Sequence, residues 1–321
     1  MKNISFKKTI VAVAVTAALA ACGGGSGSSS SGGGSVSTGV VTATSPTGVT
    51  VNGVAFNQTN ARVSVNDSAG SGLNRGIKLG MTIKIRGSTD STTDTGVASA
   101  IEISHEVEGV IAGLSGDTFT VHGQLVRFDT QTVYDGFLTN NSSALANGLQ
   151  VEVYGLYEAN GDIRATLIEL EDVDFEDEVR GVVSNLNTIA GTFNIGDLLV
   201  HYDTTMTAVE DGTLAMDLIN GAVVEVHLDT SFTPNHAIKI EFEDNEDDEF
   251  EAHDGDDVEI EGYVSSYDSV AGTFMIGDVS VRVNGSTVYE GPGALGNDVL
   301  VEVEGTMVDG VLVASEVEFE D

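Results

Sequence analysis

Apolar and polar residues alternate with a period of two along most of the chain after residue 36, in short runs separated by glycine-centred turns. Runs such as TFTV at 118–121, TFNI at 192–195 and TFMI at 273–276 place every second side chain on one face. This alternation is typical of β-strands with one buried face, and no stretch keeps an apolar period of 3.6 residues. The pattern therefore predicts an all-β protein.

The runs recur as four successive copies of one pattern of five phrases. The corresponding residues Gly39, Gly109, Gly181 and Gly262 lie near the starts of the copies, at spacings of 70, 72 and 81 residues. Each copy holds a first strand, a hairpin, a looser gap with room for a helical turn, and two more alternating strands. A unit of about 65 residues is near the lower limit for a core of its own, so closing its sheet into a barrel would remove costly edges.

The order of strands, with its gap between the third and the fourth, resembles the OB-fold, a five-stranded Greek-key barrel. The recurring "GxV…TFxVxG…LxxGxxVEVxG…AxxIE" pattern resembles a family of bacterial lipoproteins that are built from repeated domains of unknown function. We therefore expect four tandem OB-like β-barrels, of which the first is the most divergent. The expected boundaries are a signal peptide at 1–21, a lipidated cysteine and tether at 22–35, barrels at 36–105, 106–175, 176–244 and 258–321, and an acidic linker at 245–257.

The near-identical phrases AGTFNIGD at 190–197 and AGTFMIGD at 271–278 fit a scaffold rather than an active site. Period two directs Phe193 and Ile195 inward, and the variable position Asn194 outward. The residues that are identical in the two phrases are thus those expected in the turns and the core of a barrel.

The first 21 residues have the features of an export signal. Three lysines precede an apolar run, TIVAVAVTAALAA, that is of signal-peptide rather than membrane-spanning length. The run ends in LAAC at 19–22, which resembles the box at which bacterial lipoprotein precursors are cut and lipidated. The resemblance implies a lipid on Cys22, and Gly23 after it implies export to the outer membrane. The glycine and serine residues of 23–35 would form a flexible tether.

Charge narrows the choice of partners. The chain has 50 acidic and 13 basic residues and a formal net charge of −37. Such a surface repels phosphate backbones, so nucleic acid is not an expected partner. Cations and basic protein surfaces are the natural counterparts.

Little in the sequence indicates catalysis. Cys22 is the only cysteine, no serine lies in a G-x-S-x-G elbow, and no two of the six histidines have helical metal-ligand spacing. Glu152, Glu225 and Glu302 share the central position of V-E-V or its equivalent, and alternation places them outside the barrels, where we expect them to be solvated. We therefore expect no enzyme.

Two acidic tracts contain the candidate metal ligands of the sequence. Seven of the ten residues 169–178 and 13 of the 21 residues 241–261 are acidic, with no lysine or arginine in either tract. Crowded carboxylates at a joint between barrels suit Ca²⁺, although neither tract has EF-hand spacing and a solvated linker is the other interpretation. The candidate ligands are Asp172, Asp174, Glu176, Asp244, Asp247, Asp248, Asp254 and Asp256.

The leading hypothesis is a non-enzymatic cell-envelope lipoprotein that presents tandem barrels as a binding or structural module. The first alternative is a Ca²⁺-dependent adhesin or polymer-binding protein with cations at the acidic junctions, and the second is a hydrolase. The expected partners are the outer membrane, through the lipid on Cys22, and an envelope protein or polysaccharide. No cofactor other than Ca²⁺ is expected.

Overall fold

The computed structural model describes residues 34–65, 76–171, 177–210, 213–214, 217–232, 235–242 and 250–320. Strands and turns dominate these residues, and the described part contains no α-helix and a single turn of 3-10 helix at Ser142–Ala144. The prediction of an all-β protein is confirmed. No helix in the described part is long and apolar enough to cross a membrane.

Residues 178–242 form a closed barrel of five strands, here called barrel III. Its strands are β14 (Glu178–Asn187), β15 (Thr192–Ile195), β16 (Leu198–His201), β18 (Val223–Asp229) and β19 (Asn235–Phe242). The first strand pairs with the second, the second with the third, the third in parallel with the fifth, the fifth with the fourth, and the fourth with the first. This ring leaves no free edge within the barrel, as in a small Greek-key barrel.

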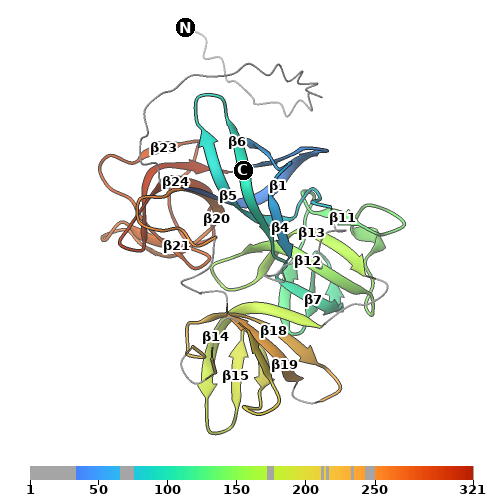
Figure 1. Ribbon diagram of the computed structural model, residues 1–321. Helices are drawn as coiled ribbons and strands as arrows, with labels where there is room; N and C mark the ends of the chain where they lie inside the picture. The colour runs from blue at the N-terminus through green and yellow to red at the C-terminus, as the bar shows by residue number, and fades with distance from the viewer. Residues whose placement is uncertain are drawn as a thin grey trace. The chain divides into compact units, whose positions relative to one another are not determined.

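The same circular order of strands occurs three more times, and in barrel II the first strand is interrupted and forms β7 and β8 (Figure 1). Barrel II contains β7 (Val107–Val110), β8 (Ala112–Ser115), β9 (Thr118–Val121), β10 (Gln124–Arg127), β12 (Gln150–Tyr157) and β13 (Ile163–Glu171). Barrel IV contains β20 (Asp257–Asp268), β21 (Thr273–Ile276), β22 (Val279–Arg282), β24 (Leu300–Val308) and β25 (Val311–Phe319). Barrel I contains β1 (Ser35–Ser45), β2 (Gly48–Val51), β3 (Val54–Asn57), β5 (Thr82–Asp90) and β6 (Thr95–Ile103).

The gap between the third and fourth phrases is more ordered than the sequence predicts. It holds a short strand that pairs in parallel with the fifth strand of its own barrel, as β4 (Arg62–Val65), β11 (Val133–Asp135), β17 (Ala208–Glu210) and β23 (Val288–Glu290) do. The gaps lack long apolar runs, so their strand character comes from a neighbouring edge rather than from their own pattern. Only the gap of barrel II also contains a helical turn within the described residues.

The alternation correctly predicts which side chains fill the cores. Phe119, Phe193 and Phe274, each the second residue of its strand, are buried, as are Ile195 and Ile276 two positions later. Between them, Asn194 is only half-buried on the opposite face. The repeated phrase is therefore a scaffold element, as its sequence indicates.

The glycine of the first phrase is required by close packing. In each barrel this glycine faces a side chain at the end of the second strand or in the turn after it, and a methyl group on the glycine would collide with that side chain. An added Cβ would lie 2.0 Å from Asn52 Oδ1 for Gly39, 2.2 Å from His122 Nε2 for Gly109, 2.7 Å from Ile195 Cγ2 for Gly181 and 2.4 Å from Ile276 Cγ2 for Gly262. Since real Cβ atoms do not approach so closely, a side chain there would have to displace the side chain that it meets.

We expect Gly262→Ala to lower the free energy of unfolding by about 1–3 kcal/mol, the usual cost of overpacking a core. The matched control is Gly285→Ala in the same barrel, because no atom lies within 4 Å of its added Cβ. Chemical unfolding of both variants tests this. Equal stability of the two variants would contradict the packing explanation.

The barrels are joined in pairs by strand pairing. In barrels II and III, β7 and β14 are antiparallel neighbours, with Val107 opposite Val179 and Glu108 opposite Glu178. In barrels I and IV, β1 runs parallel to β20 over Ser35–Thr38. Two large sheets result, one of 13 strands and one of 12. The described residues of all four barrels fall within one compact unit.

Candidate functional site

A row of ionisable side chains crosses barrels II and III on their outer faces. The residues opposite one another on successive strands are, in order, Glu169, Glu152, Glu108, Glu178, His227 and Lys239. Residues that are paired in register on neighbouring strands point to the same face of a sheet. The junction of β7 with β14 thereby continues the row from one barrel into the next.

The centre of the row is buried, contrary to the sequence-based expectation. Glu152 is 0% exposed and Glu225, next to the row on β18, is 2% exposed. Alternation correctly places both outside their own barrel cores, but the prediction that they are solvated is wrong. Tyr154 and Leu167, which are paired in register beside Glu152, pack into the core cluster of barrel I. Another barrel therefore covers the outer face of barrel II.

His105 connects two of these carboxylates. Its Nδ1 lies 3.2 Å from Oε1 of Glu152, and its Nε2 lies 3.0 Å from Oε2 of Glu178. The hydroxyl of Tyr154 donates to the same oxygen of Glu152 at 2.7 Å. Burial by itself would lower the pKa of His105, but the hydrogen bonds to the two carboxylates raise it well above 6.5. The ring is therefore an imidazolium with both nitrogens engaged.

His227 repeats this arrangement from the side of barrel III. Its Nδ1 lies 2.8 Å from Oε1 of Glu178, and its Nε2 lies 3.4 Å from Oε2 of Glu241 and 3.6 Å from Oε1 of Glu225. Burial opposes the charge, but hydrogen bonds to Glu178 and Glu241 raise the pKa of His227 to about 11. The two oxygens of Glu178 thus face two different histidines. Although burial favours its neutral form, these contacts hold the pKa of Glu178 far below its usual range.

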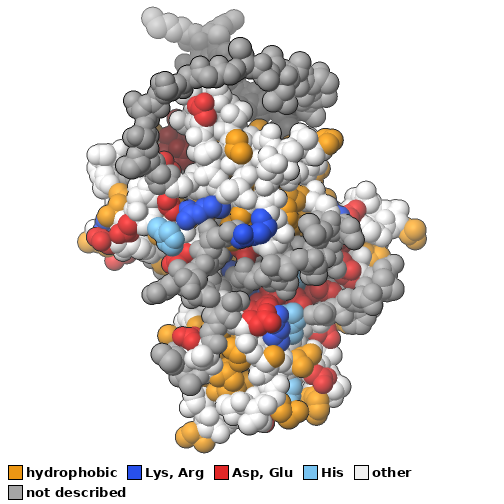
Figure 2. Space-filling model, viewed as in Figure 1, with side chains coloured by type: hydrophobic (Ala, Val, Ile, Leu, Met, Phe, Trp, Pro, Cys, Tyr) orange, Lys and Arg blue, Asp and Glu red, His pale blue; other side chains and the backbone are white. Residues whose placement is uncertain are grey.

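We call His105, Glu108, Glu152, Glu178, Glu225, His227 and Glu241 the joint cluster. Basic side chains flank it: Lys239 binds Glu241 and, at 2.7 Å, Glu210, while a guanidinium nitrogen of Arg180 lies 3.7 Å from Glu106. Figure 2 shows acidic, basic and histidine side chains gathered where β7, β14 and β18 meet. Because neither imidazole has a nitrogen available to accept a proton, the arrangement does not suit general base catalysis.

The outer face of barrel IV differs, because six glutamates lie side by side on three of its strands. Glu259, Glu304 and Glu316 lie opposite one another on three strands, as do Glu261, Glu302 and Glu318. We call these six residues the acidic face. Among the residues that the structure describes, no ion pair reaches Glu259, Glu261, Glu302, Glu304 or Glu316.

Protonation of some of its glutamates reduces the charge repulsion within the acidic face. Burial, followed by the charges of Glu259 and Glu261, raises the pKa of Glu302 to about 9. Burial also raises the pKa of Glu259, to about 7, although the hydroxyl of Ser37 donates to its Oε2 at 2.7 Å. At neutral pH, Glu302 is therefore a carboxylic acid rather than a carboxylate.

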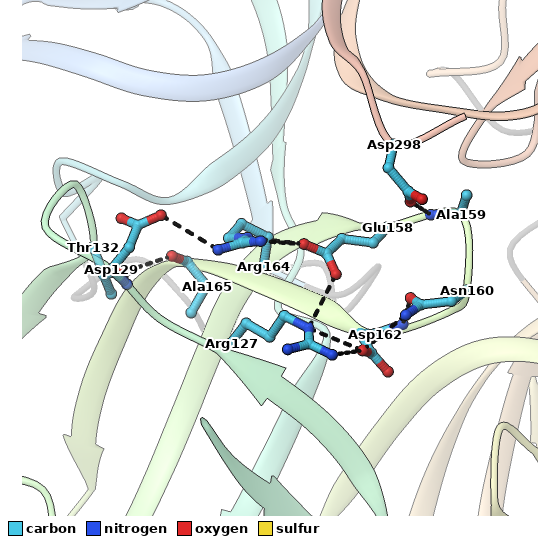
Figure 3. A network of polar contacts seen from close by, with 10 residues as sticks. All are labelled: Arg127, Asp129, Thr132, Glu158, Ala159, Asn160, Asp162, Arg164, Ala165 and Asp298. Carbon is cyan, nitrogen blue, oxygen red and sulfur yellow. Dashed lines mark hydrogen bonds and ion pairs between the residues drawn. The ribbon is translucent and has the colours of Figure 1, made fainter. Parts of the chain in front are cut away.

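The third strand of barrel II, where an OB-fold would offer a ligand face, is closed by internal ion pairs (Figure 3). Nε of Arg127 lies 3.2 Å from Oε2 of Glu158, and its Nη2 lies 2.7 Å from Oδ2 of Asp162. Arg164 also contacts Glu158. In this barrel the position is occupied by a partly exposed salt-bridge network, which by itself contributes little stability.

The acidic-tract residues predicted to bind Ca²⁺ are only partly within the described structure. Asp172, Asp174, Glu176, Asp244, Asp247 and Asp248 lie outside the described residues, as does Cys22. Oδ2 of Asp256 lies 2.5 Å from the Arg86 guanidinium, and Oδ1 of Asp254 accepts the backbone N–H of Gly310 at 3.3 Å. Although burial opposes its charge, the bond from Arg86 holds the pKa of Asp256 below its usual value. Asp256 thus serves to join barrels I and IV.

The sequence contains a signal for the joint cluster that period analysis alone overlooks. HEVE at 105–108 and VEVH at 224–227 each place a histidine and a glutamate at outward positions or just before a strand. Alternation shows which face a residue is on, but not whether another barrel covers that face. His105, Glu178 and His227 come together only because β7 pairs with β14.

Comparison with known families identifies the repeats. Residues 108–169, 180–241 and 261–318 each match one family model, described as "Domain of unknown function (DUF5666)", and together they cover more than half of the chain. The chain belongs to the DUF5666 family. Barrels II, III and IV are thus three DUF5666 domains, and the joint cluster lies between the first two of them.

Other comparisons add little to the family assignment. No curated protein matches the chain. One solved structure to which it is similar is the crystal structure of a multidomain protein with nucleic acid binding domains from Streptococcus pneumoniae TIGR4. That match has 11% identity and a TM-score of 0.17, over 67% of this chain and 72% of that one. A similarity this weak carries no argument about fold or ligand.

Proposed function

We propose that this DUF5666 protein is a non-enzymatic lipoprotein of the bacterial cell envelope whose barrels serve as a structural and binding module. The observation that carries the proposal is the engagement of both nitrogens of His105 by carboxylates, with His227 in a similar position. Groups with strongly shifted pKa values, among them Glu178 and His227, hold barrels II and III together. They are used as structural contacts rather than as a catalytic acid and base.

We further propose that residues 36–105 are a fourth, divergent copy of the same domain. Barrel I has the circular strand order of barrels II to IV, and Gly39 occupies the tightly packed position of Gly109. Barrel I also carries basic side chains that neutralise acidic ones. Lys84 lies opposite Glu102 on its outer face, and Arg86 contacts Asp256 just before barrel IV. Divergence of its sequence would then reflect its role in covering neighbouring barrels.

A lipid on Cys22 would anchor the module to the outer membrane, with residues 23–35 as the predicted tether. The LAAC box and the glycine and serine composition support this assignment. The high negative charge favours an envelope protein or a polysaccharide presented with cations as the partner, and disfavours nucleic acid.

Replacing Cys22 with alanine is expected to move the protein from the detergent phase to the aqueous phase in a detergent-partition assay, because the lipid would have no sulfur to attach to. Ser28→Ala in the tether is the matched control and should stay in the detergent phase. Metabolic labelling with a fatty acid checks the modification directly. Retention of the Cys22→Ala variant in the detergent phase would contradict lipid anchoring at this residue.

A further inference from the structure

We propose that the joint cluster is a two-metal site for first-row transition-metal ions of the Zn²⁺ type, in which the carboxylate of Glu178 bridges one ion held by His105 and a second ion held by His227. The site lies across two DUF5666 domains. This inference goes beyond the structural role proposed above, which would stand without any metal.

The geometry around Glu178 is that of a bridging carboxylate. Oε2 faces Nε2 of His105 at 3.0 Å, and Oε1 faces Nδ1 of His227 at 2.8 Å. Ligands bound to a tetrahedral zinc ion at about 2.0–2.1 Å are separated from one another by about 3.3 Å, so small shifts would admit an ion at each contact. In two-metal sites the ions lie roughly 3.5–4 Å apart, a separation that one bridging carboxylate can span.

Each proposed ion has a further carboxylate within reach. One oxygen of Glu108 lies with ligand atoms of His105 and Glu178 in a group whose members are all within 4.8 Å of one another. Glu225 completes a second such group with Glu178 and His227. Its Oε1 lies 3.6 Å from Nε2 of His227, so its side chain would turn toward Nδ1 to reach the second ion. Each group thus supplies one imidazole nitrogen and two carboxylate oxygens, ligand types that bind Zn²⁺, and leaves a fourth position open.

The surroundings of the two histidines match those of metal-binding histidines. Such a ring almost always donates its second N–H to a carboxylate or carbonyl, which fixes its orientation. For His105, Nδ1 lies 3.2 Å from Glu152, which is itself held by the hydroxyl of Tyr154. For His227, Nε2 lies 3.4 Å from Glu241, which is held by Lys239. The outer contacts thus leave Nε2 of His105 and Nδ1 of His227 directed at Glu178. An ion bound at either nitrogen would replace the proton there, which is released to solvent.

The combination of imidazole and carboxylate donors favours transition-metal ions over Ca²⁺ and Mg²⁺. Imidazole nitrogen suits zinc, iron, nickel and copper, whereas Ca²⁺ and Mg²⁺ prefer oxygen ligands alone. The position also suggests a use, because β7 and β14 are paired over only two residues in each strand. Ions held from both strands would strengthen this short junction between the domains.

The test uses the full chain, purified in detergent and stripped of metal with a chelator. Equilibrium dialysis against Zn²⁺ should give two bound ions per chain, and dialysis against Ca²⁺ should give none at this cluster. X-ray absorption of the zinc-loaded protein should show imidazole among nitrogen and oxygen ligands. Absence of imidazole from the zinc coordination would overturn the proposal without any need for a variant.

Variants locate the ions. His105→Gln and His227→Gln should each lower the zinc affinity of one site by about tenfold or more, the size of effect that lost ligands and outer contacts produce. Two matched controls, His201→Gln on β16 and Glu304→Gln on the acidic face, should still bind two ions. Circular dichroism confirms that each variant is folded. If zinc binding is unchanged in both cluster variants, or is lost in Glu304→Gln instead, the site does not lie where we propose.

Discussion

Replacing Glu178 with alanine is expected to lower the free energy of unfolding by about 3–5 kcal/mol, measured by urea denaturation of metal-stripped protein. Removing one partner of a buried ion pair leaves the other charge uncompensated, which is the source of that cost. Here one carboxylate serves two buried partners, because His105 and His227 each contact a different oxygen of Glu178. Glu178 thereby links His105, just before barrel II, to His227 of barrel III.

Two comparisons separate this effect from a general loss of charge. Glu178→Gln keeps the shape and one acceptor oxygen, so its loss of stability should be smaller than that of the alanine variant. Glu290→Ala, at an exposed position of β23, should change stability by less than about 0.5 kcal/mol. A Glu178→Ala variant as stable as Glu290→Ala would show that the joint cluster does not hold the barrels together.

Glu302→Gln is expected to stabilise the protein at pH 9 by about 1–3 kcal/mol, the range for relieving a buried group that lacks a compensating partner. The pKa of Glu302 is raised from 4.5 to about 9. The folded state therefore binds a proton that the unfolded chain has released at neutral pH, and this contribution is fully present below pH 4.5. It is lost as pH rises towards 9.

Thermal unfolding at pH 5, 7 and 9 tests the sign of this effect. The melting temperature of the unmodified protein should fall between pH 5 and pH 9, and the fall should be smaller in Glu302→Gln, which cannot ionise. Glu259, with a pKa of about 7, adds to the same trend at lower pH. A melting temperature that rises with pH over this range, or an equal fall in the variant, would contradict the assignment of a protonated Glu302.

The fold could be predicted from sequence because its requirements are local. Alternation over four to nine residues fixes which side chains enter a core, and Phe193 and Ile195 are buried as expected. The first-phrase glycine also recurs for a local reason, which is contact with the end of the second strand. The short strand in each gap could not be predicted in this way because β17, for example, depends on the edge of β19 and has little pattern of its own.

The candidate site depends on contacts that are not local. Glu152 has the same V-E-V context as other outward residues, and nothing near it in the sequence shows that Tyr154 beside it packs into barrel I. Contact between His105 and Glu178 depends on the pairing of two strands whose faces look alike in sequence. The Ca²⁺ candidates predicted from acidic composition lie between the strands, whereas the groups with shifted pKa values, such as Glu178 and Glu241, lie in strands at the ends of the same tracts.

The parallel pairing of β1 with β20 has a mechanical consequence. Any pull on residues before Ser35 enters the folded unit along β1, which is hydrogen-bonded to β5 on one side and to β20 on the other. Such bonds run largely across the strand, so a load along β1 must shear several of them together instead of opening them one by one. During synthesis β1 is made long before its partner β20, because Ser37 and Glu259, which are hydrogen-bonded to each other, are 222 residues apart in the sequence. A chain without barrel IV would therefore lack one of the two strands that hold β1 in place.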